Sequence, residues 1–349
     1  MNLRPTLARC VAVCVLAAGC GGTGGPPPAA APSTSAPPPA EPAAAGPPRI
    51  PPVGRVISIG NAPEGIVVGS SGIAAVAVRH PDAIVLIDAA TGAVRRSVAT
   101  EGAARHLALA GPEGPVLVPL EGSNQLWQLT FAGDVTAASV RVGRQPHDAA
   151  QTAGGTIVVT NELGGGVVFV RGASVVGSRP AGPAQPGGVA AVGDYAAVAD
   201  VRGNGVWVYD GSTQRLATHG PVGAKLTHAV ALSGDLAAFA DTDGGAVLVE
   251  RVGPQLAAVA KVDAPGRPYG LAFDAARQRI YVTLTASNQL RVIDISHPSR
   301  PRIVGDAPTV RQPNSVAVDP RSGSVLVTGS APGADSGLQI VTVDELPKG

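Results

Sequence analysis

The chain has few cysteines and aromatic residues, and it carries no excess of one charge. Its three cysteines, Cys10, Cys14 and Cys20, lie at the N-terminus, so the rest of the chain can form no disulfide and no cysteine-ligated metal site. Phe, Trp and Tyr make up 3% of the 349 residues, and the formal net charge is +1. Proteins that bind nucleic acid through its phosphates carry a basic excess, so we expect no nucleic-acid partner.

The N-terminus has the layout of an export signal. Arg4 and Arg9 precede an apolar run from Val11 to Gly19, which is too short to span a bilayer. We therefore predict a signal peptide over residues 1–19. Its end, "LAAGC", resembles a bacterial lipobox, which implies that Cys20 is lipidated and becomes the mature N-terminus. The alternative is ordinary cleavage near Ala18 and release of a secreted protein.

Lipidation at Cys20 would place the protein at the cell membrane, on the extracytoplasmic face, because an acylated cysteine with more than one chain anchors firmly. The following residues, 20–54, are dominated by Pro, Ala and Gly, with Glu41 and Arg49 as the only charges. Such a composition cannot form a core and favours extended conformations. We predict a disordered linker here, with a docking segment for a partner protein as the alternative.

The remainder, residues 55–346, is a repeat of short apolar runs bounded by Gly, Pro, Asp and Asn, without helical periodicity. Each repeat begins with one residue, usually polar, that follows a turn and precedes a run of small apolar residues. We call these the guest positions. Spaced 40 to 45 residues apart, they are Glu64, Arg105, His147, Gly187, His228, Tyr269 and Asn314.

A repeat of about 40 residues with about four strands is typical of β-propellers. The seventh repeat is one strand short, and an unassigned strand, "RVISIG" at residues 55–60, precedes the first repeat. Pairing of this strand with the last repeat would cover an exposed sheet edge. The sequence therefore predicts an all-β, seven-bladed β-propeller in which an N-terminal strand closes the last blade.

Two segments support a family resemblance. The "YVT" at Tyr281–Thr283 and the "IDAATGAV" at Ile87–Val94 resemble the YVTN-type β-propeller repeat of bacterial surface and periplasmic proteins. The resemblance implies the same seven-bladed fold and an extracytoplasmic location. It covers residues 55–346, although the second to fifth repeats match loosely.

The inner strands of a propeller enter from one face, so we expect the guest residues to surround one mouth of the central channel and to be exposed there. Glycines beside them should allow close packing. Convergent polar groups at a concave site suit a small ligand. The predicted ligand-binding residues are Glu64, Arg105, His106, His147, Asp148, His228, Tyr269 and Asn314.

Residues after each second strand should open on the same face. They are Arg79, Glu121, Asn161, Glu162, Asp200 and Asp241. Three other histidines, His80, His219 and His297, are expected to be plain loop residues.

Two catalytic alternatives use the same mouth. His147 and His228 with Glu64 or Asp148 are acceptable metal ligands, although their spacing is that of separate blades. Seven-bladed lactonases use Glu, Arg and His at this mouth. By that resemblance a hydrolase would use Glu64, Arg105, His147 and His228, with a carboxylate or imidazole as general base.

No GxSxG segment or phosphate-binding glycine loop occurs. We therefore expect a binding protein rather than an enzyme, with no cofactor and no metal. Its partner at the mouth would be an envelope protein, a cell-wall component or a small polar ligand. A scaffold that binds through its rim is the remaining alternative.

Overall fold

The computed structural model describes residues 41–135, 139–329, 331 and 337–349. All of these residues belong to one compact unit. The predicted signal peptide, Cys20 and the linker up to residue 40 lie outside the described residues. Within the described part, no helix has the length and apolar character needed to cross a membrane.

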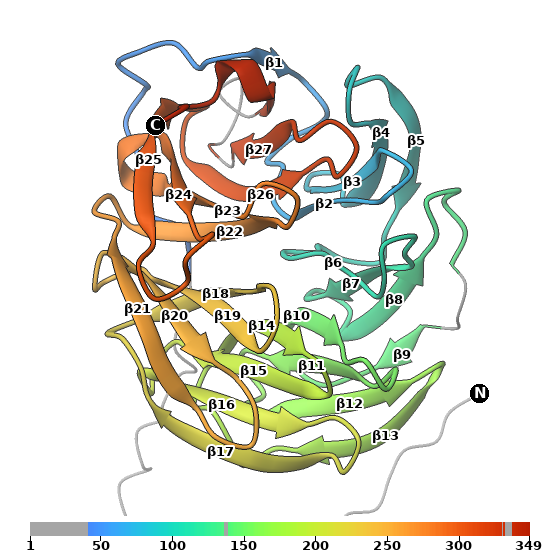
Figure 1. The fold of residues 1–349 in the computed structure, drawn as a ribbon. Helices are drawn as coiled ribbons and strands as arrows, with labels where there is room; N and C mark the ends of the chain where they lie inside the picture. The colour runs from blue at the N-terminus through green and yellow to red at the C-terminus, as the bar shows by residue number, and fades with distance from the viewer. Residues whose placement is uncertain (1–40, 136–138, 330, 332–336) are drawn as a thin grey trace, which may run out of the picture. The chain divides into compact units, whose positions relative to one another are not determined.

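The strands of the described residues form seven antiparallel sheets of four strands each, which confirms the predicted seven-bladed, all-β fold (Figure 1). Blade 1 contains β2 (Ile66–Val68), β3 (Ile73–Val78), β4 (Ala83–Asp88) and β5 (Val94–Ala99). Blade 2 contains β6 (Ala108–Leu109), β7 (Val116–Leu120), β8 (Gln125–Leu129) and β9 (Val140–Arg141). Blade 3 contains β10 (Pro146–Gln151), β11 (Ile157–Asn161), β12 (Val167–Arg171) and β13 (Ser174–Arg179).

The later blades repeat this order. Blade 4 contains β14 (Pro186–Val192), β15 (Tyr195–Asp200), β16 (Gly205–Asp210) and β17 (Arg215–Pro221). Blade 5 contains β18 (Leu226–Ala231), β19 (Leu236–Asp241), β20 (Ala246–Arg251) and β21 (Ala257–Asp263). Blade 6 contains β22 (Pro268–Asp274), β23 (Arg279–Leu284), the 3₁₀ turn η1 (Thr285–Ser287), β24 (Gln289–Asp294) and β25 (Arg302–Pro308).

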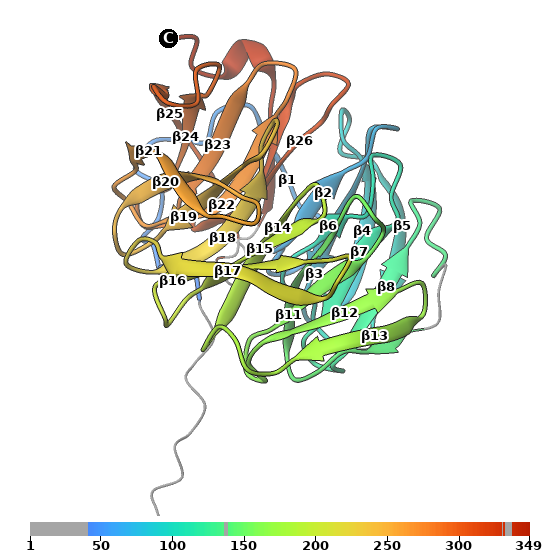
Figure 2. The ribbon, with the colours of Figure 1, turned by 60° about the horizontal axis from the view of Figure 1, so that its bottom comes forward.

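Blade 7 confirms the predicted closure by the N-terminal strand. It contains β26 (Pro313–Val318), β27 (Val325–Gly329), β28 (Gly337–Val341) and, as its fourth strand, β1 (Arg55–Ile57); the turn η3 (Val343–Glu345) follows β28. β1 pairs antiparallel with β28, with Val56 opposite Gln339. The innermost strands of neighbouring blades contact one another in sequence order, and β26 contacts β2, so the ring is closed (Figures 1 and 2).

The second strand of each blade is buried on both faces, which explains its unbroken apolar sequence. In β3, Ala74 and Val76 pack with blade 7, whereas Ala75 and Ala77 pack with blade 2. Because alternate residues of a strand face opposite sides of the sheet, a strand between two blades needs apolar residues at every position. The outer strands are exposed, as in β5.

Glycines beside the guest positions allow the innermost strands to approach closely, as predicted. A Cβ atom on Gly65 would lie 2.6 Å from the carbonyl oxygen of Arg105, and one on Gly270 would lie 2.3 Å from that of Asn314. At the fourth guest position itself, a Cβ on Gly187 would lie 2.8 Å from the carbonyl oxygen of Thr227. Backbone crowding therefore excludes a side chain from these places.

Bulges in the innermost strands set the direction of the guest side chains. The pairing of β10 with β11 skips His147, because Pro146 lies opposite Asn161 and Asp148 lies opposite Thr160. The residue before the proline has a positive φ, 51° at Gln145. A bulge with such a turn re-aims a side chain, and similar irregularities occur in β14, β18, β22 and β26.

The same pairing corrects one guest position. In blade 5, Leu226 lies opposite Asp241 and His228 lies opposite Ala240, so the skipped residue is Thr227. His228 therefore corresponds to Asp148 of blade 3, one residue further along the strand than the alignment predicted. A shift of one residue leaves the repeat spacing within 40 to 45, so spacing alone allows either residue, and the backbone pairing decides the register.

The end of the predicted linker, residues 41–54, lies against the ring rather than free of it; we call it the tether segment. The side chain of Arg311 donates through Nε to the carbonyl oxygen of Ala45 at 2.8 Å. Asn288 Nδ2 donates to the carbonyl oxygen of Gly46 at 2.9 Å. Ala45 is buried, which the composition of the segment gave no reason to expect.

Candidate functional site

The guest side chains gather as predicted, but they are buried rather than exposed. Glu64, Arg105, His147, Tyr269 and Asn314 are all at most 7% exposed. The expectation of an exposed mouth was wrong, because the residues after each second strand and the tether segment cover the guests. Buried charges need partners, so their contacts define the site.

Charged residues of blades 1 and 2 form a connected network at the level of the guest residues, which we call the first layer of the channel. Arg79 Nη2 donates to Glu64 Oε2 at 2.8 Å. Arg105 Nε donates to Glu121 Oε1 at 3.0 Å, and Arg79 lies 3.7 Å from the other Glu121 oxygen. The first two pairs each join a guest residue to the residue that follows the second strand of its own blade, and the third links the two blades.

The two glutamates of this network differ in their pKa. Burial raises the pKa of Glu64, although the charges of Arg105 and Arg79 oppose the change. For Glu121, the burial effect is outweighed by His147 and Arg105, so its pKa is lowered. Glu121 is therefore the more firmly ionised carboxylate.

His147 lies between two carboxylates at the centre of the site. Its Nδ1 is 3.4 Å from Glu121 Oε1 and 3.3 Å from Glu162 Oε2. Burial opposes a charge on the ring, but the negative charge of Glu162 and the contacts with Glu121 outweigh it and raise the pKa of His147 to about 10. The imidazole is therefore protonated at neutral pH unless a cation takes the place of the proton.

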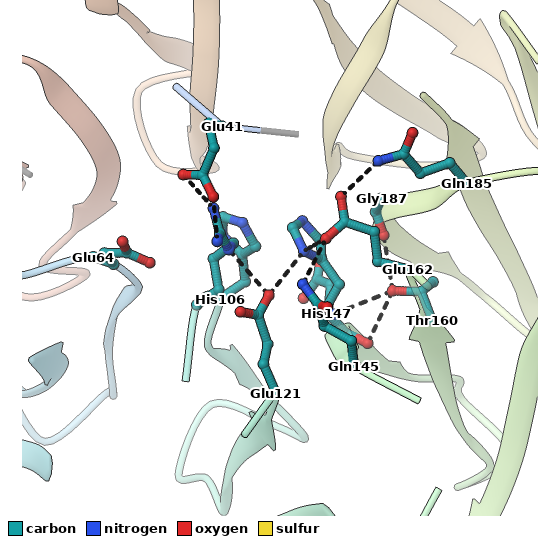
Figure 3. A network of polar contacts seen from close by, with 12 residues as sticks. Glu41, Glu64, His106, Glu121, Gln145, His147, Thr160, Glu162, Gln185 and Gly187 are labelled. Carbon is teal, nitrogen blue, oxygen red and sulfur yellow. Dashed lines mark hydrogen bonds and ion pairs between the residues drawn. The ribbon is translucent and has the colours of Figure 1, made fainter. Parts of the chain in front are cut away.

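Glu162 is itself held by amide side chains. Its Oε1 accepts a hydrogen bond from Gln185 Nε2 at 3.0 Å, and Gln145 Nε2 lies 3.4 Å from its Oε2 (Figure 3). The potential ligand atoms of Glu121, His147 and Glu162 all lie within 4.8 Å of one another. This trio could hold a divalent cation.

A second layer of polar residues lies one position further along the innermost strands. Here His228 Nε2 lies 3.1 Å from the ring nitrogens of His106. Burial, with the neighbouring positive charge, lowers the pKa of both rings well below the usual value. Both imidazoles are neutral at pH 7, so one ring donates and the other accepts.

Asp148 belongs to the same layer and joins two blades. Its Oδ2 accepts from the backbone N–H of Val189 in blade 4 at 3.0 Å. Burial raises its pKa to about 6, although that hydrogen bond opposes the change. His106, Asp148 and His228 line a channel cavity of about 70 Å³, which is room for about two water molecules.

Contacts between tilted aromatic rings connect the layers. The centroid of the Tyr269 ring lies 4.2 Å from that of His228, and the His106 ring lies 4.5 Å from that of His147. Burial raises the pKa of Tyr269, so its hydroxyl stays protonated.

Several buried polar atoms near the channel lack a hydrogen-bond partner among the described residues. They are both side-chain atoms of Asn314, His147 Nε2, His228 Nδ1 and Arg79 Nε. Buried polar atoms are nearly always paired with protein or water. These atoms are therefore available to water or to a ligand.

Some predicted mouth residues have local structural roles instead. Asp200 accepts backbone hydrogen bonds from Ala184, Gln185 and Gly203, and Asp241 similarly holds its own loop. Asn161 donates to the carbonyl oxygen of Val142. His219 stacks on Trp207 in the outer part of blade 4, and His80 and His297 also lie outside the site.

Several site residues were absent from the predicted ligand-binding set. Glu121 and Glu162 were expected only as residues facing the mouth, and Gln145 and Gln185 were not considered. A search for the residue two before each guest would have found both glutamines. Glu41 had no sequence signal, because it stands alone in a Pro- and Ala-rich segment.

Comparison with known proteins supports the fold. The LVIVD repeat matches residues 281–309, which run from β23 to β25 in blade 6. None of the curated proteins compared matches the chain.

Solved β-propellers superpose along most of the chain. Virginiamycin B lyase from Staphylococcus aureus is 12% identical, with a TM-score of 0.65, over 81% of this chain and 95% of that one. The β-propeller domain of Swd1 from Myceliophteria thermophila is 14% identical, with a TM-score of 0.69, over 84% and 100%. Hydrazine synthase from Kuenenia stuttgartiensis is 15% identical, with a TM-score of 0.68, over 82% and 96%. At such identities the likeness shows the seven-bladed fold alone.

Proposed function

We propose that the protein is a lipid-anchored binding protein on the extracytoplasmic face of a bacterial cell membrane, of the YVTN type. The "LAAGC" segment and the absence of cysteine after Cys20 support lipidation at that residue. Metabolic labelling with a palmitate analogue tests the anchor. The wild-type chain should be labelled and the Cys20→Ser variant should not; equal labelling, or none in either, contradicts lipidation at Cys20.

The ligand of this protein is a small polar molecule that enters the site from the channel mouth. One observation carries this proposal: Asn314, with no exposed surface, has neither side-chain atom paired among the described residues. An unpaired buried polar group costs about 1–3 kcal/mol, which a ligand or ordered water would recover. Structures with the same fold include a virginiamycin B lyase with quinupristin and a chain of the mitotic checkpoint complex, so the fold is compatible with a small-molecule or a protein partner.

Thermal unfolding with a panel of sugars, amino acids, organic acids and cell-wall fragments tests the binding site. A molecule that binds only the folded chain must raise the melting temperature. The rise should be lost in Asn314→Ala and retained in His297→Ala, a matched change at an exposed loop residue. An equal rise in both variants places the site elsewhere. An envelope protein or cell-wall polymer that binds independently of Asn314 would favour the rim.

A metal-assisted hydrolase is the second candidate, because Glu121, His147 and Glu162 form a possible cation site. The cation would activate water, and a neighbouring carboxylate would accept its proton. Arg105 donates to the same Glu121 oxygen that faces His147, which disfavours a second positive charge there. Elemental analysis decides: stoichiometric metal in the wild type that is lost in Glu162→Gln favours this candidate, and metal-free protein that takes up none on addition excludes it.

A further inference from the structure

Arg105 presents a complete two-point anion contact at the mouth. Its side chain is 3% exposed, and its Nε is taken by Glu121 of the ring. Its Nη1 and Nη2 donate to the two oxygens of one carboxylate, at 2.9 and 2.7 Å, and that carboxylate belongs to Glu41. Parallel hydrogen bonds from both Nη atoms are the geometry by which arginine recognises carboxylates.

Glu41 does not belong to the ring. It lies on the tether segment, whose nearest ring contacts are those of Ala45 with Arg311 and Gly46 with Asn288, before blade 7 and within blade 6. Arg105 belongs to blade 2. The tether segment therefore carries the carboxylate from one side of the channel mouth to a blade on another side.

The contact is open to solvent on the Glu41 side. The Glu41 side chain is 57% exposed, whereas that of Arg105 is nearly buried. Figure 3 shows Glu41 on a short segment of its own, separate from the strands that carry the other labelled residues. A dissolved carboxylate could thus reach the two Nη atoms if Glu41 moved aside, without any change in the ring.

Without Glu41, Arg105 keeps one carboxylate contact among the described residues of the ring, from its Nε to Glu121 Oε1. The other carboxylates of this layer have contacts of their own, Glu64 with Arg79 and Glu162 with His147. The two Nη atoms of Arg105 would then have no carboxylate partner among the contacts described for the ring. A buried guanidinium with unpaired donors is costly, so this point needs an acceptor with two oxygens, from Glu41 or from a ligand.

We propose that the ligand of this propeller carries a carboxylate that binds the Nη1 and Nη2 atoms of Arg105, and that Glu41 occupies this position in the ligand-free chain. The inference rests on the proposed function of the mouth as a ligand site. It assigns the ligand to the carboxylates and identifies Glu41 as a side chain of the same protein that competes with the ligand for Arg105. Because Glu41 is only four residues from Ala45, its effective concentration at Arg105 is on the order of millimolar, and a free acid must compete with it.

Acetate is the minimal probe, with acetamide as its neutral match and inorganic phosphate as the alternative anion. The Glu41→Gln variant removes the competing charge and keeps the size of the side chain. It should melt below the wild type, and acetate should restore its melting temperature, with an apparent affinity about tenfold tighter than for the wild type. Acetamide should have no effect, and phosphate should act more weakly than acetate.

The double variant Glu41→Gln, Arg105→Lys keeps the positive charge but lacks the two-point contact, so acetate should no longer stabilise it. The matched control is Glu101→Gln, an exposed glutamate that accepts a hydrogen bond from Gln125 rather than from Arg105, and its response to acetate should equal that of the wild type. Equal stabilisation of Glu41→Gln by acetate and acetamide overturns the proposal, as does acetate stabilisation that survives Arg105→Lys. If either of these results is obtained, but a molecule of the thermal-unfolding panel still loses its effect in Asn314→Ala, then the mouth remains a binding site. Only the assignment of a carboxylate ligand is then rejected.

Discussion

His228 Nε2 lies 3.1 Å from the ring nitrogens of His106, although the two residues are 122 positions apart in the chain. Their rings are nearly perpendicular, at 81°. The contact exists because both residues stand one position after the guest layer, in blades 2 and 5. Two neutral imidazoles thus share a hydrogen bond inside the channel.

This pair predicts a measurable coupling. His228→Leu should destabilise the chain by about 1–3 kcal/mol, because it leaves a buried nitrogen of His106 without its partner. The double variant His106→Leu, His228→Leu should cost clearly less than the sum of the two single changes. Urea unfolding of the four proteins measures the coupling. Additive costs would show that the two rings do not interact.

The charge on His147 makes stability depend on pH. Its pKa is raised from 6.5 to about 10 on folding, so the folded chain holds this proton more tightly than the unfolded chain. The resulting stabilisation is complete below about pH 6.5 and is lost as the pH rises through about 10. The melting temperature of the wild type should therefore fall between pH 7 and pH 10 more than that of His147→Gln.

Measurements above pH 7 also avoid the titration of Asp148. Its pKa is about 6, so at lower pH its protonation would also change the melting temperature. A difference between wild type and His147→Gln that is constant from pH 7 to pH 10 would contradict a protonated His147. A bound cation in place of the proton would produce that result, and elemental analysis of the same samples identifies it.

The repeat made most of the fold predictable. The spacing of Glu64, Arg105 and His147 gives the number of blades, and the unpaired strand before Glu64 gives the closure. These features depend on local sequence, since each blade repeats one set of short strands and turns. The side chains that surround the mouth follow from the same repeat.

The pairing of those side chains was not predictable. His228 was assigned to the guest layer because the repeat spacing of 40 to 45 residues fits His228 and Thr227 equally well, and only the backbone pairing identifies Thr227 as the guest. Burial of the guests was missed because it depends on covering residues, including Glu41, whose position across the mouth comes from three-dimensional contacts alone. A repeat predicts where a residue lies in its blade, but not what another blade places against it.

Close packing at the hub gives a further prediction. Gly270→Ala should destabilise the chain by about 1–3 kcal/mol, because its Cβ would lie 2.3 Å from the carbonyl oxygen of Asn314 and would separate blades 6 and 7. In the control Gly253→Ala, the nearest atom to the added Cβ is the carbonyl oxygen of Gln255 at 4.0 Å, so little change in the free energy of unfolding is expected. Urea unfolding compares them, and equal stability of the two variants would contradict the close approach.

Two substitutions in β1, the strand that closes blade 7, should differ in their effect on stability. Val56 is 48% exposed and pairs with Gln339, so its main contribution is backbone pairing rather than burial. Val56→Pro cannot keep the ladder geometry and should lower the melting temperature by several degrees, whereas Val56→Thr should preserve it. Equal melting temperatures for the two variants would mean that β1 does not hold the ring closed.

The central claim is that the mouth binds its ligand through Arg105. A crystal structure of the Glu41→Gln chain at saturating acetate tests it most directly. We expect this structure to contain an acetate whose two oxygens lie within hydrogen-bond distance of Nη1 and Nη2 of Arg105. Acetate bound elsewhere, with these two nitrogens paired only to the substituted side chain or to other protein groups, would contradict it.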